Sequence, residues 1–342
     1  MAVRRHRELA LLLFSTALSL AAVEVALRAL YGAPPRFLYP QESYVADADV
    51  GHWPKPGQRA FSHDAVVTTN RLGLRDRDLP ARVPAGVRRI LAIGDSQTYG
   101  EGLALEDTWP KQLEAALRAE DPSARWEVVN AGISGTDTWQ HERVLRRLLE
   151  AYEAHGVALA FYVNDVAPIY VPAAPEGLTN TASKRVGYVL KRSALFSLVW
   201  ARVRAANGVG DAERRILRGE PSPRIEEGWA QVERSLRAMK AMCDARSIPL
   251  VLAVLPRRDQ VDGSEPGSAY NRRVREAAER VGVPAVDLLE PLRAAWAEHG
   301  RALFIPWDGH NAGLANAVVA RALVAPIRAW REPPARRPAA AR

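Results

Sequence analysis

From residue 88 onward the chain alternates short apolar runs with longer segments of helical periodicity, and few folds accommodate that order. Strands are expected at 90–93, 126–129, 157–163, 249–255 and 283–288, and helices after Asp107 and at 140–155, 226–246, 270–281 and 314–330. Strands that are separated by helices pair in parallel, because each helix returns the chain to the edge from which the strand began. The pattern therefore predicts an α/β fold with a parallel sheet of about five strands over residues 88–330.

The N-terminus has the pattern of a membrane anchor. Several arginines within the first seven residues precede an apolar run at 9–23, which continues in helical periodicity to Leu30. A spanning helix needs roughly 20 such residues, and its basic flank remains in the cytoplasm. We therefore expect an uncleaved signal anchor, a transmembrane helix over 1–30, with the rest of the chain outside the cytoplasmic membrane, in the periplasm. Residues 19–21 offer a cleavage site, and cleavage there would make the protein secreted.

The segment between this helix and the sheet domain has a different composition. Residues 31–87 are rich in proline, glycine and turn-forming residues, with a strand expected at 65–69 and a turn at 70–76. We expect an N-terminal extension that packs on the sheet domain. At the other end, residues 331–342 are dominated by proline, alanine and arginine, and they are predicted to form a disordered tail.

The charge and the cysteine content limit which partners and which metal sites are expected. The net charge is +8, and the basic residues are almost all arginine. No basic cluster coincides with the aromatic side chains that stack nucleic-acid bases, so nucleic-acid binding is not expected. Cys243 is the only cysteine, which excludes an intramolecular disulfide and a cysteine metal cluster. No spacing of His, Asp and Glu indicates a metal site, and no cofactor is expected.

Polar residues with complementary chemistry follow the predicted strands. Ser96, Gly132 and Asn164 each come after the carboxyl end of a different strand, and Asp308 and His310 precede the last helix. Because the carboxyl ends of parallel strands share one edge of the sheet, these residues are expected around one crevice. Acyl transfer requires a hydroxyl nucleophile, an imidazole base, a carboxylate that orients it and donors for the developing oxyanion. The sequence supplies all four.

The same residues resemble the four sequence blocks of the SGNH (GDSL-type) hydrolase family, in that family's order. Gly94-Asp95-Ser96 matches the first block, Gly132 and Asn164 the next two, and Asp308 with His310 the last. The resemblance implies a flavodoxin-like three-layer α/β/α sandwich in which Ser96, His310 and Asp308 are catalytic. It also implies an oxyanion hole formed by the Ser96 amide, the Gly132 amide and the Asn164 side chain.

Three further features bear on this resemblance. Membrane-anchored SGNH-like proteins often carry an Asn-x-x-Gly-Leu-Arg-Asp segment before the serine block, and residues 70–76 match it. Tyr162 stands where the family usually has glycine. Asp308 and His310 are two residues apart, whereas many members have three. The last difference concerns the role of Asp308, because the spacing decides whether its carboxylate reaches the imidazole ring.

A long insertion at 167–224 separates the third strand from the next helix. Its centre, at 186–203, is apolar on one side and carries several basic residues. We expect a helical cap on the body of the protein, with a lid or a membrane-surface helix as the alternative. Arg257 and Arg258 follow the fourth strand and reach the same edge as Ser96, so they are candidates for binding an anionic substrate group.

These observations predict a serine-dependent SGNH-type esterase that is held at the membrane by its N-terminal helix. The substrate is expected to be an acyl ester, most simply an O-acetyl ester, of an envelope glycan or lipid. An O-acyltransferase that modifies an extracytoplasmic polysaccharide is the first alternative, because a sugar hydroxyl can replace water in attacking the acyl-enzyme. A non-catalytic SGNH-like binding or scaffold module is the second. Intact Ser96, His310 and Asn164 favour an enzyme.

Overall fold

The structure, a computed structural model, describes residues 2–166, 182–208, 210–265 and 267–330. Its centre is a five-stranded parallel sheet in the order β6-β5-β7-β8-β9. The strands are β5 (Val87–Gly94), β6 (Arg125–Gly132), β7 (Gly156–Phe161), β8 (Leu250–Val254) and β9 (Ala285–Asp287). The strand order reverses at β5, because β6 lies on one side of it and β7 on the other. The five predicted strands and their parallel pairing are confirmed.

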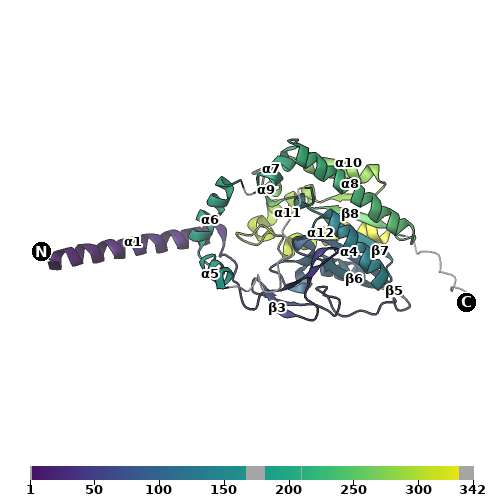
Figure 1. Ribbon diagram of the computed structural model, residues 1–342, viewed down its shortest axis with the longest axis horizontal. Coiled ribbons are helices and arrows are strands. Elements are labelled where there is room, and N and C mark those ends of the chain that lie inside the picture. The colour runs from purple at the N-terminus through teal and green to yellow at the C-terminus, as the bar shows by residue number, and fades with distance from the viewer. Residues whose placement is uncertain (1, 167–181, 209, 266, 331–342) are drawn as a thin grey trace, which may run out of the picture.

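Alternate residues of the strands face two opposite layers of helices (Figure 1). On β5, Leu91 and Ile93 pack in one core, while Ile90 and Ala92 pack in the other, and all four are fully buried. The first layer contains α4 (Thr138–Ala151), α8 (Pro223–Asp244) and α10 (Ala269–Arg280), and the second contains α3 (Trp109–Glu120), α11 (Leu289–His299) and α12 (Gly313–Arg328). A sheet covered on both faces explains why its strands are unbroken apolar runs.

The helices of the two layers lie close to the predicted segments, with one exception. α11 was not predicted, because only Leu289 and Leu292 are buried along it and two residues do not establish a helical period. Its position matters for the site, since the segment that follows it, Gly300–Leu303, is a 3-10 turn leading into the loop with Asp308 and His310.

The N-terminal extension forms two antiparallel hairpins and a turn. β1 (Tyr44–Asp47) pairs with β2 (Gly51–Pro54), and β3 (Arg59–Ser62) pairs with β4 (Ala65–Thr68). Only β4 was predicted, because four-residue strands show too few alternations to be recognised. The predicted turn is present: the Asn70 side-chain oxygen accepts hydrogen bonds from the amides of Leu72 and Leu74 at 2.9 and 3.0 Å.

The insertion after β7 contains three helices within its described part. They are α5 (Ala182–Leu190), α6 (Ala194–Ala206) and α7 (Asp211–Arg218). α7 buries Ile216 and Leu217 in the core on the α8 side of the sheet. The first part of the predicted insertion, 167–181, and the predicted tail, 331–342, lie outside the described residues.

α1 (Ala2–Tyr31) extends away from the sheet domain as a single helix (Figure 1). Residues Arg4–Tyr31 are long and apolar enough to cross a membrane, with a mean hydropathy of 2.1 and no part of the apolar window buried. A membrane span and a signal sequence both have these properties. The end of the helix is bonded to the body, because Arg301 Nη1 donates to Leu30 O at 2.6 Å and Trp307 Nε1 donates to Gly32 O at 2.8 Å.

Candidate active site

Ser96 begins α2 (Ser96–Tyr99), the short helix that follows β5 at the point where the strand order reverses. The preceding Asp95 caps this helix, since its Oδ1 accepts a hydrogen bond from the Gln97 amide at 2.9 Å. Gly94 is required because a Cβ there would lie 2.2 Å from Thr98 Oγ1. Each residue of the Gly-Asp-Ser sequence therefore has a local reason for its place, and Ser96 is held half-buried at the carboxyl edge of the sheet.

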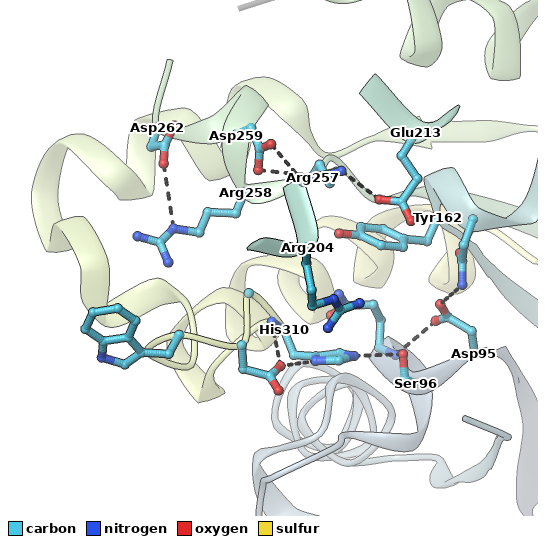
Figure 2. Close-up of a pocket in the computed structure, with 15 residues that line it drawn as sticks. Asp95, Ser96, Tyr162, Arg204, Glu213, Arg257, Arg258, Asp259, Asp262 and His310 are labelled. Atoms are coloured by element: carbon cyan, nitrogen blue, oxygen red, sulfur yellow. Dashed lines mark hydrogen bonds and ion pairs between the residues drawn. The ribbon is translucent and has the colours of Figure 1, made fainter. Parts of the chain in front are cut away.

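A second loop brings an imidazole to Ser96. His310 Nε2 lies 2.8 Å from Ser96 Oγ, and His310 Nδ1 contacts Asp308 Oδ1 (Figure 2). The loop is closed by a hydrogen bond from the Ile305 amide to His310 O at 2.8 Å, and Trp307 adopts a left-handed φ of +64° within it. A separation of two residues thus places a carboxylate on one ring nitrogen and the serine hydroxyl on the other.

The carboxylates near His310 change the pKa of its imidazole. Burial alone lowers the pKa of His310, but the Asp308 carboxylate outweighs burial and raises that pKa to about 10. Burial likewise raises the pKa of Asp308, and the charge and hydrogen bonds of His310 outweigh this effect and hold it well below its usual range. Glu101 Oε2 lies 3.7 Å from His310 Nε2 and adds to the basicity of the ring. The neutral form of His310 is therefore a strong base toward the proton of Ser96, and this form is reached at alkaline pH.

The Ser96–His310 pair opens into a cleft of about 610 Å³. Figure 2 shows that its walls come from the end of β5, from Tyr162 after β7, from the α9 region (Arg258–Val261), and from the loop with His310. Asn164 also lines the cleft. Arg204 of α6 and Glu213 of α7 complete the lining, so the inserted helices form part of the site. Most of the described lining residues are charged, and the site is polar as a result.

Comparison with known proteins identifies the kind of enzyme. The sequence model of the GDSL-like lipase/acylhydrolase family matches residues 92–310, which include Ser96, Asn164, Asp308 and His310. The chain belongs to this family. As a GDSL-like lipase/acylhydrolase it is a serine hydrolase of ester bonds. A search of curated proteins gave no match.

Several solved structures are similar to this family member. The crystal structure of TesA is 17% identical and aligns over 71% of this chain and 100% of that chain, with a TM-score of 0.44. The acetylxylan esterase Axe2 from Geobacillus stearothermophilus, solved as a catalytic mutant, is 17% identical over 70% of this chain and 93% of that chain, with a TM-score of 0.43. The SGNH-hydrolase family esterase AlinE4 is 20% identical over 64% and 82%, with a TM-score of 0.36.

Two of the three predicted oxyanion donors lie at the cleft of this hydrolase. Asn164 lines the cleft and donates from Nδ2 to Asp95 Oδ2 at 3.0 Å. A carboxamide nitrogen carries two hydrogens, so one of them is not used in the bond to Asp95. Ser96 is the first residue of α2, and the amide at that position has no acceptor within the helix itself.

The third predicted donor, the amide of Gly132, is not available. It donates to Asn130 Oδ1 at 3.1 Å within the end of β6. A Cβ at Gly132 would lie 2.1 Å from the Tyr99 amide nitrogen, so the glycine is needed for the close packing of β6 against α2. This corrects the prediction, since Gly132 serves packing. The loop after β6 reaches the site two residues later, where Ser134 Oγ donates to Glu101 Oε2 at 3.5 Å.

Both predicted substrate-binding arginines line the cleft, but they differ in how firmly they are held. Arg257 donates from Nη1 to Glu213 Oε2 at 2.6 Å, and its Nη2 lies 2.9 Å from Asp259 Oδ2. Arg257 lines the cleft and its charge is balanced within the protein, where it ties α7 to α9, so its binding of a substrate stays a prediction. Arg258 lines the cleft and is held only loosely, at 3.6 Å from Asp262. Arg204, which the sequence did not single out, points into the same cleft from the cap (Figure 2).

Two buried residues of the extension support the site, and sequence analysis assigned them no role. His63 Nε2 lies 3.5 Å from Asp308 Oδ2, on the side of the carboxylate away from His310. Arg75 donates to the carbonyl oxygens of Tyr99 and Gly100 at 3.0 and 2.5 Å and also to that of Leu103. The Asn-x-x-Gly-Leu-Arg-Asp segment was the sequence signal for Arg75. Nothing in the sequence indicated His63, because its partner is 245 positions away.

His141, a histidine outside the cleft, lies in the interior of the protein. It is buried on the inner face of α4, where its Nε2 lies 3.0 Å from Thr136 Oγ1, and burial lowers its pKa to about 3. Asp165 orients the loop after β7, because it accepts hydrogen bonds from Thr138 Oγ1 and from the Tyr162 amide, both at 2.8 Å. Within the described residues, no group of three or more His, Cys, Asp or Glu is arranged to hold a metal ion.

Proposed function

We propose that the chain is an esterase, anchored in the cytoplasmic membrane, that removes short acyl groups, most simply acetyl, from a polar envelope alcohol outside the cytoplasm. One observation carries the proposal: Ser96 Oγ lies 2.8 Å from His310 Nε2, and Asp308 contacts the opposite ring nitrogen. A serine beside a base that is itself oriented by a carboxylate is an activated nucleophile.

The proposed reaction has two steps, acylation of Ser96 and deacylation, and the same groups act in both. Ser96 Oγ attacks the ester carbonyl carbon while His310 Nε2 takes the hydroxyl proton, and Asp308 stabilises the resulting imidazolium. The Ser96 amide and Asn164 Nδ2 are placed to donate to the oxyanion that develops. His310 then protonates the departing alcohol. In the second half His310 deprotonates a water, which attacks the acyl-enzyme, and the acid leaves as Ser96 regains its proton.

The lining of the cleft supports a short acyl group on a polar alcohol. Long acyl chains require apolar surface for their burial, at roughly 25 cal/mol per Å². Apart from Tyr162, Trp307 and Gly309, the described lining residues have polar or charged side chains. A glycan hydroxyl suits such walls better than a fatty chain does, and Arg204 and Arg258 favour a substrate that carries a carboxylate or phosphate.

The proposed location follows from the N-terminal helix. The basic start of α1, its length and its uncovered apolar surface support a membrane span. We propose residues 1–30 as the anchor, 31–87 as an extension that supports the site, and 88–330 as the catalytic domain with a cap at 167–224. The basic flank stays in the cytoplasm, so the catalytic domain lies in the periplasm, and cleavage after α1 would release it.

Replacing Ser96 tests the proposal directly. The full-length protein and its Ser96→Ala variant are incubated with a chromogenic acetyl ester and with a phosphonate probe for active-site serines. We expect hydrolysis to fall to background and labelling to disappear in the variant, while thermal unfolding is unchanged. Equal labelling of both proteins would contradict the assignment of Ser96 as the nucleophile.

An O-acyltransferase is the second candidate, and the size of the cleft favours keeping it. About 610 Å³ exceeds what an acetyl ester occupies and leaves room for an acceptor sugar beside Ser96. The same assay with added sugar acceptors, followed by mass analysis, separates the two activities. Acylated sugar that forms faster than free acid would make the protein a transferase, and ester loss that does not depend on the acceptor would make it an esterase.

A further inference from the structure

α5 has an apolar face that no described residue covers. Val186, Val189 and Leu190 share one side of the helix and are 60, 58 and 46% exposed. A different side of the helix is held to the protein by Tyr188, whose ring stacks on Phe37 with a centroid separation of 4.3 Å. The apolar face of α5 therefore points away from the body of the protein.

α6 repeats this arrangement with an aromatic residue. Val199, Trp200 and Val203 are 53, 45 and 44% exposed and lie on one side of the helix. At 3.6 residues per turn, Arg202 and Arg204 fall on the two edges of this apolar strip. An apolar strip that includes tryptophan and is flanked by arginines is the pattern of a helix that lies in a membrane interface.

Both helices are attached to the end of α1. The Glu24 carboxylate accepts hydrogen bonds from the amides of Ala194 and Leu195 at 2.9 and 3.0 Å, so a side chain of α1 caps α6. Arg28 Nη2 donates to Arg192 O at 2.6 Å, in the link between α5 and α6. Figure 1 shows α5 and α6 beside the end of α1, between it and the sheet domain. Because α5 and α6 are bonded to the end of α1, they lie at the membrane surface if α1 spans a bilayer.

The charge of this segment matches one kind of membrane. Residues 182–208 contain six basic residues and no aspartate or glutamate. The basic residues are Lys184, Arg185, Lys191, Arg192, Arg202 and Arg204. A basic surface next to exposed apolar side chains binds leaflets that contain anionic lipids more strongly than neutral ones.

We propose that α5 and α6 form a membrane-docking surface that holds the active-site cleft against an anionic lipid leaflet. The proposal rests on the proposed anchoring by α1. Arg204 belongs to this surface and lines both the cleft and an adjoining cavity of about 520 Å³, which Trp200 and Trp307 also line. The docked helices therefore border the approach to Ser96, and the enzyme acts on esters that are presented at the membrane surface, such as those of lipid-linked glycans.

The experiment reads the depth of individual positions in the full-length protein. The chain is placed in lipid nanodiscs of phosphatidylcholine with phosphatidylglycerol, and an environment-sensitive fluorophore is attached at Val189→Cys or Val203→Cys. Cys243 does not compete, since it is buried and burial raises the pKa of its thiol to about 12. Leu18→Cys within α1 reports insertion of the anchor, and Glu276→Cys on α10 reports a position expected in water.

We expect the labels at 189 and 203 to shift their emission to the blue and to be quenched by lipid-borne nitroxides several times more strongly than the label at 276. Labels at 189 and 203 that behave like the one at 276 would overturn the docking surface. If the label at 18 is in lipid and the ester is still hydrolysed, that result leaves the anchor and the proposed esterase intact. A label at 18 that stays in water would overturn both the anchor and the docking surface.

A second arm tests the charge. Nanodiscs of phosphatidylcholine alone are compared with those that contain phosphatidylglycerol, and Arg202→Gln is added to the Val203→Cys protein. We expect weaker quenching at 203 in neutral lipid and in the Arg202→Gln variant. Equal quenching in all three samples would overturn the preference for anionic lipid.

Discussion

Asp308 lies between two imidazole rings. Its Oδ1 contacts His310 Nδ1, and its Oδ2 lies 3.5 Å from His63 Nε2. The first contact makes His310 more basic, and the second limits the directions in which the carboxylate can turn. Both functions are consequences of single contacts, so each can be removed by one substitution and measured separately.

The first prediction concerns pH. Asp308 raises the pKa of His310 to about 10, and only the neutral imidazole accepts the Ser96 proton. We therefore expect kcat/KM to rise with pH from neutrality toward about 10. In Asp308→Asn the acidic limb should move down toward the ordinary histidine value of about 6.5, with a maximal rate on the order of 10⁴-fold lower. Initial rates measured across pH test both effects. If the acidic limb of the pH profile does not move in Asp308→Asn, other groups, Glu101 among them, control the basicity of the His310 ring.

The second prediction concerns His63. Without its imidazole the Asp308 carboxylate has fewer restraints, so His63→Ala should lower kcat by about tenfold, which is ~1.4 kcal/mol of barrier. KM should not change, because His63 does not belong to the lining of the cleft. His63→Gln keeps a hydrogen-bond donor and should restore most of the rate. If His63→Gln is as slow as His63→Ala, or if only stability changes, His63 does not position Asp308.

At the scale of elements, the turn at 70–76 holds the helix that begins at Ser96. Arg75 is 1% exposed and donates to three carbonyl groups, one on the last residue of α2 and two in the segment that follows it. A neighbouring residue, Asp76, accepts a hydrogen bond from the Asn130 amide on β6 at 2.8 Å. The extension is therefore part of the framework of the site, although the family match begins only at residue 92.

The third prediction follows from this contact. Arg75→Met should destabilise the protein by about 1–3 kcal/mol or more, because buried carbonyl groups lose their donor. Arg71→Met in the same turn is the matched control. The Arg71 side chain is 65% exposed and lies 3.8 Å from Asp78, so its loss should change stability by less than about 0.5 kcal/mol. Urea unfolding of both variants measures the difference in the free energy of unfolding. Similar unfolding midpoints would show that the hydrogen bonds of Arg75 do not stabilise the protein.

At the scale of the whole molecule, α1 is connected directly to the loop that carries Asp308 and His310. Tyr31, the last residue of α1, packs edge-on against Trp307 with a centroid separation of 5.5 Å. Trp307 also donates to Gly32 O, and Asp308 is the next residue in the chain. The end of α1 thus contacts the catalytic loop directly, and the anchoring proposed above would bring Ser96 near the membrane surface.

The fourth prediction is the orientation of the chain. Two reporters are fused in turn after Trp330. A reporter that is active only outside the cytoplasm should give a signal, and a reporter that fluoresces only in the cytoplasm should give none. Replacing Arg4, Arg5 and Arg7 by alanine should weaken this orientation, because these residues supply the positive flank. A strong cytoplasmic signal from the unmodified chain would contradict the proposed location.

Much of the fold was determined by patterns between residues that are close in sequence. Five apolar runs separated by helical periods sufficed for the parallel sheet, because burial on both faces leaves no other pattern for its strands. Parallel strands share a carboxyl edge, so Ser96, Asn164 and the loop with His310 were expected to meet there. Asn70 and the turn that it closes were also predictable, since its hydrogen bonds reach only two to four residues along the chain.

Only the tertiary structure decided which polar groups are already occupied. The Gly132 amide is taken by Asn130 and the Arg257 guanidinium by Glu213 and Asp259, whereas Arg204 enters the cleft from a helix inserted between strands. His63 meets Asp308 because a hairpin of the extension packs against the catalytic loop. Periodicity reports which face of an element is buried, but a hydrogen bond to a distant residue depends on how elements pack. That packing is set by the whole chain, and for this reason the partners of His63, Arg75 and Arg257 appear only in three dimensions.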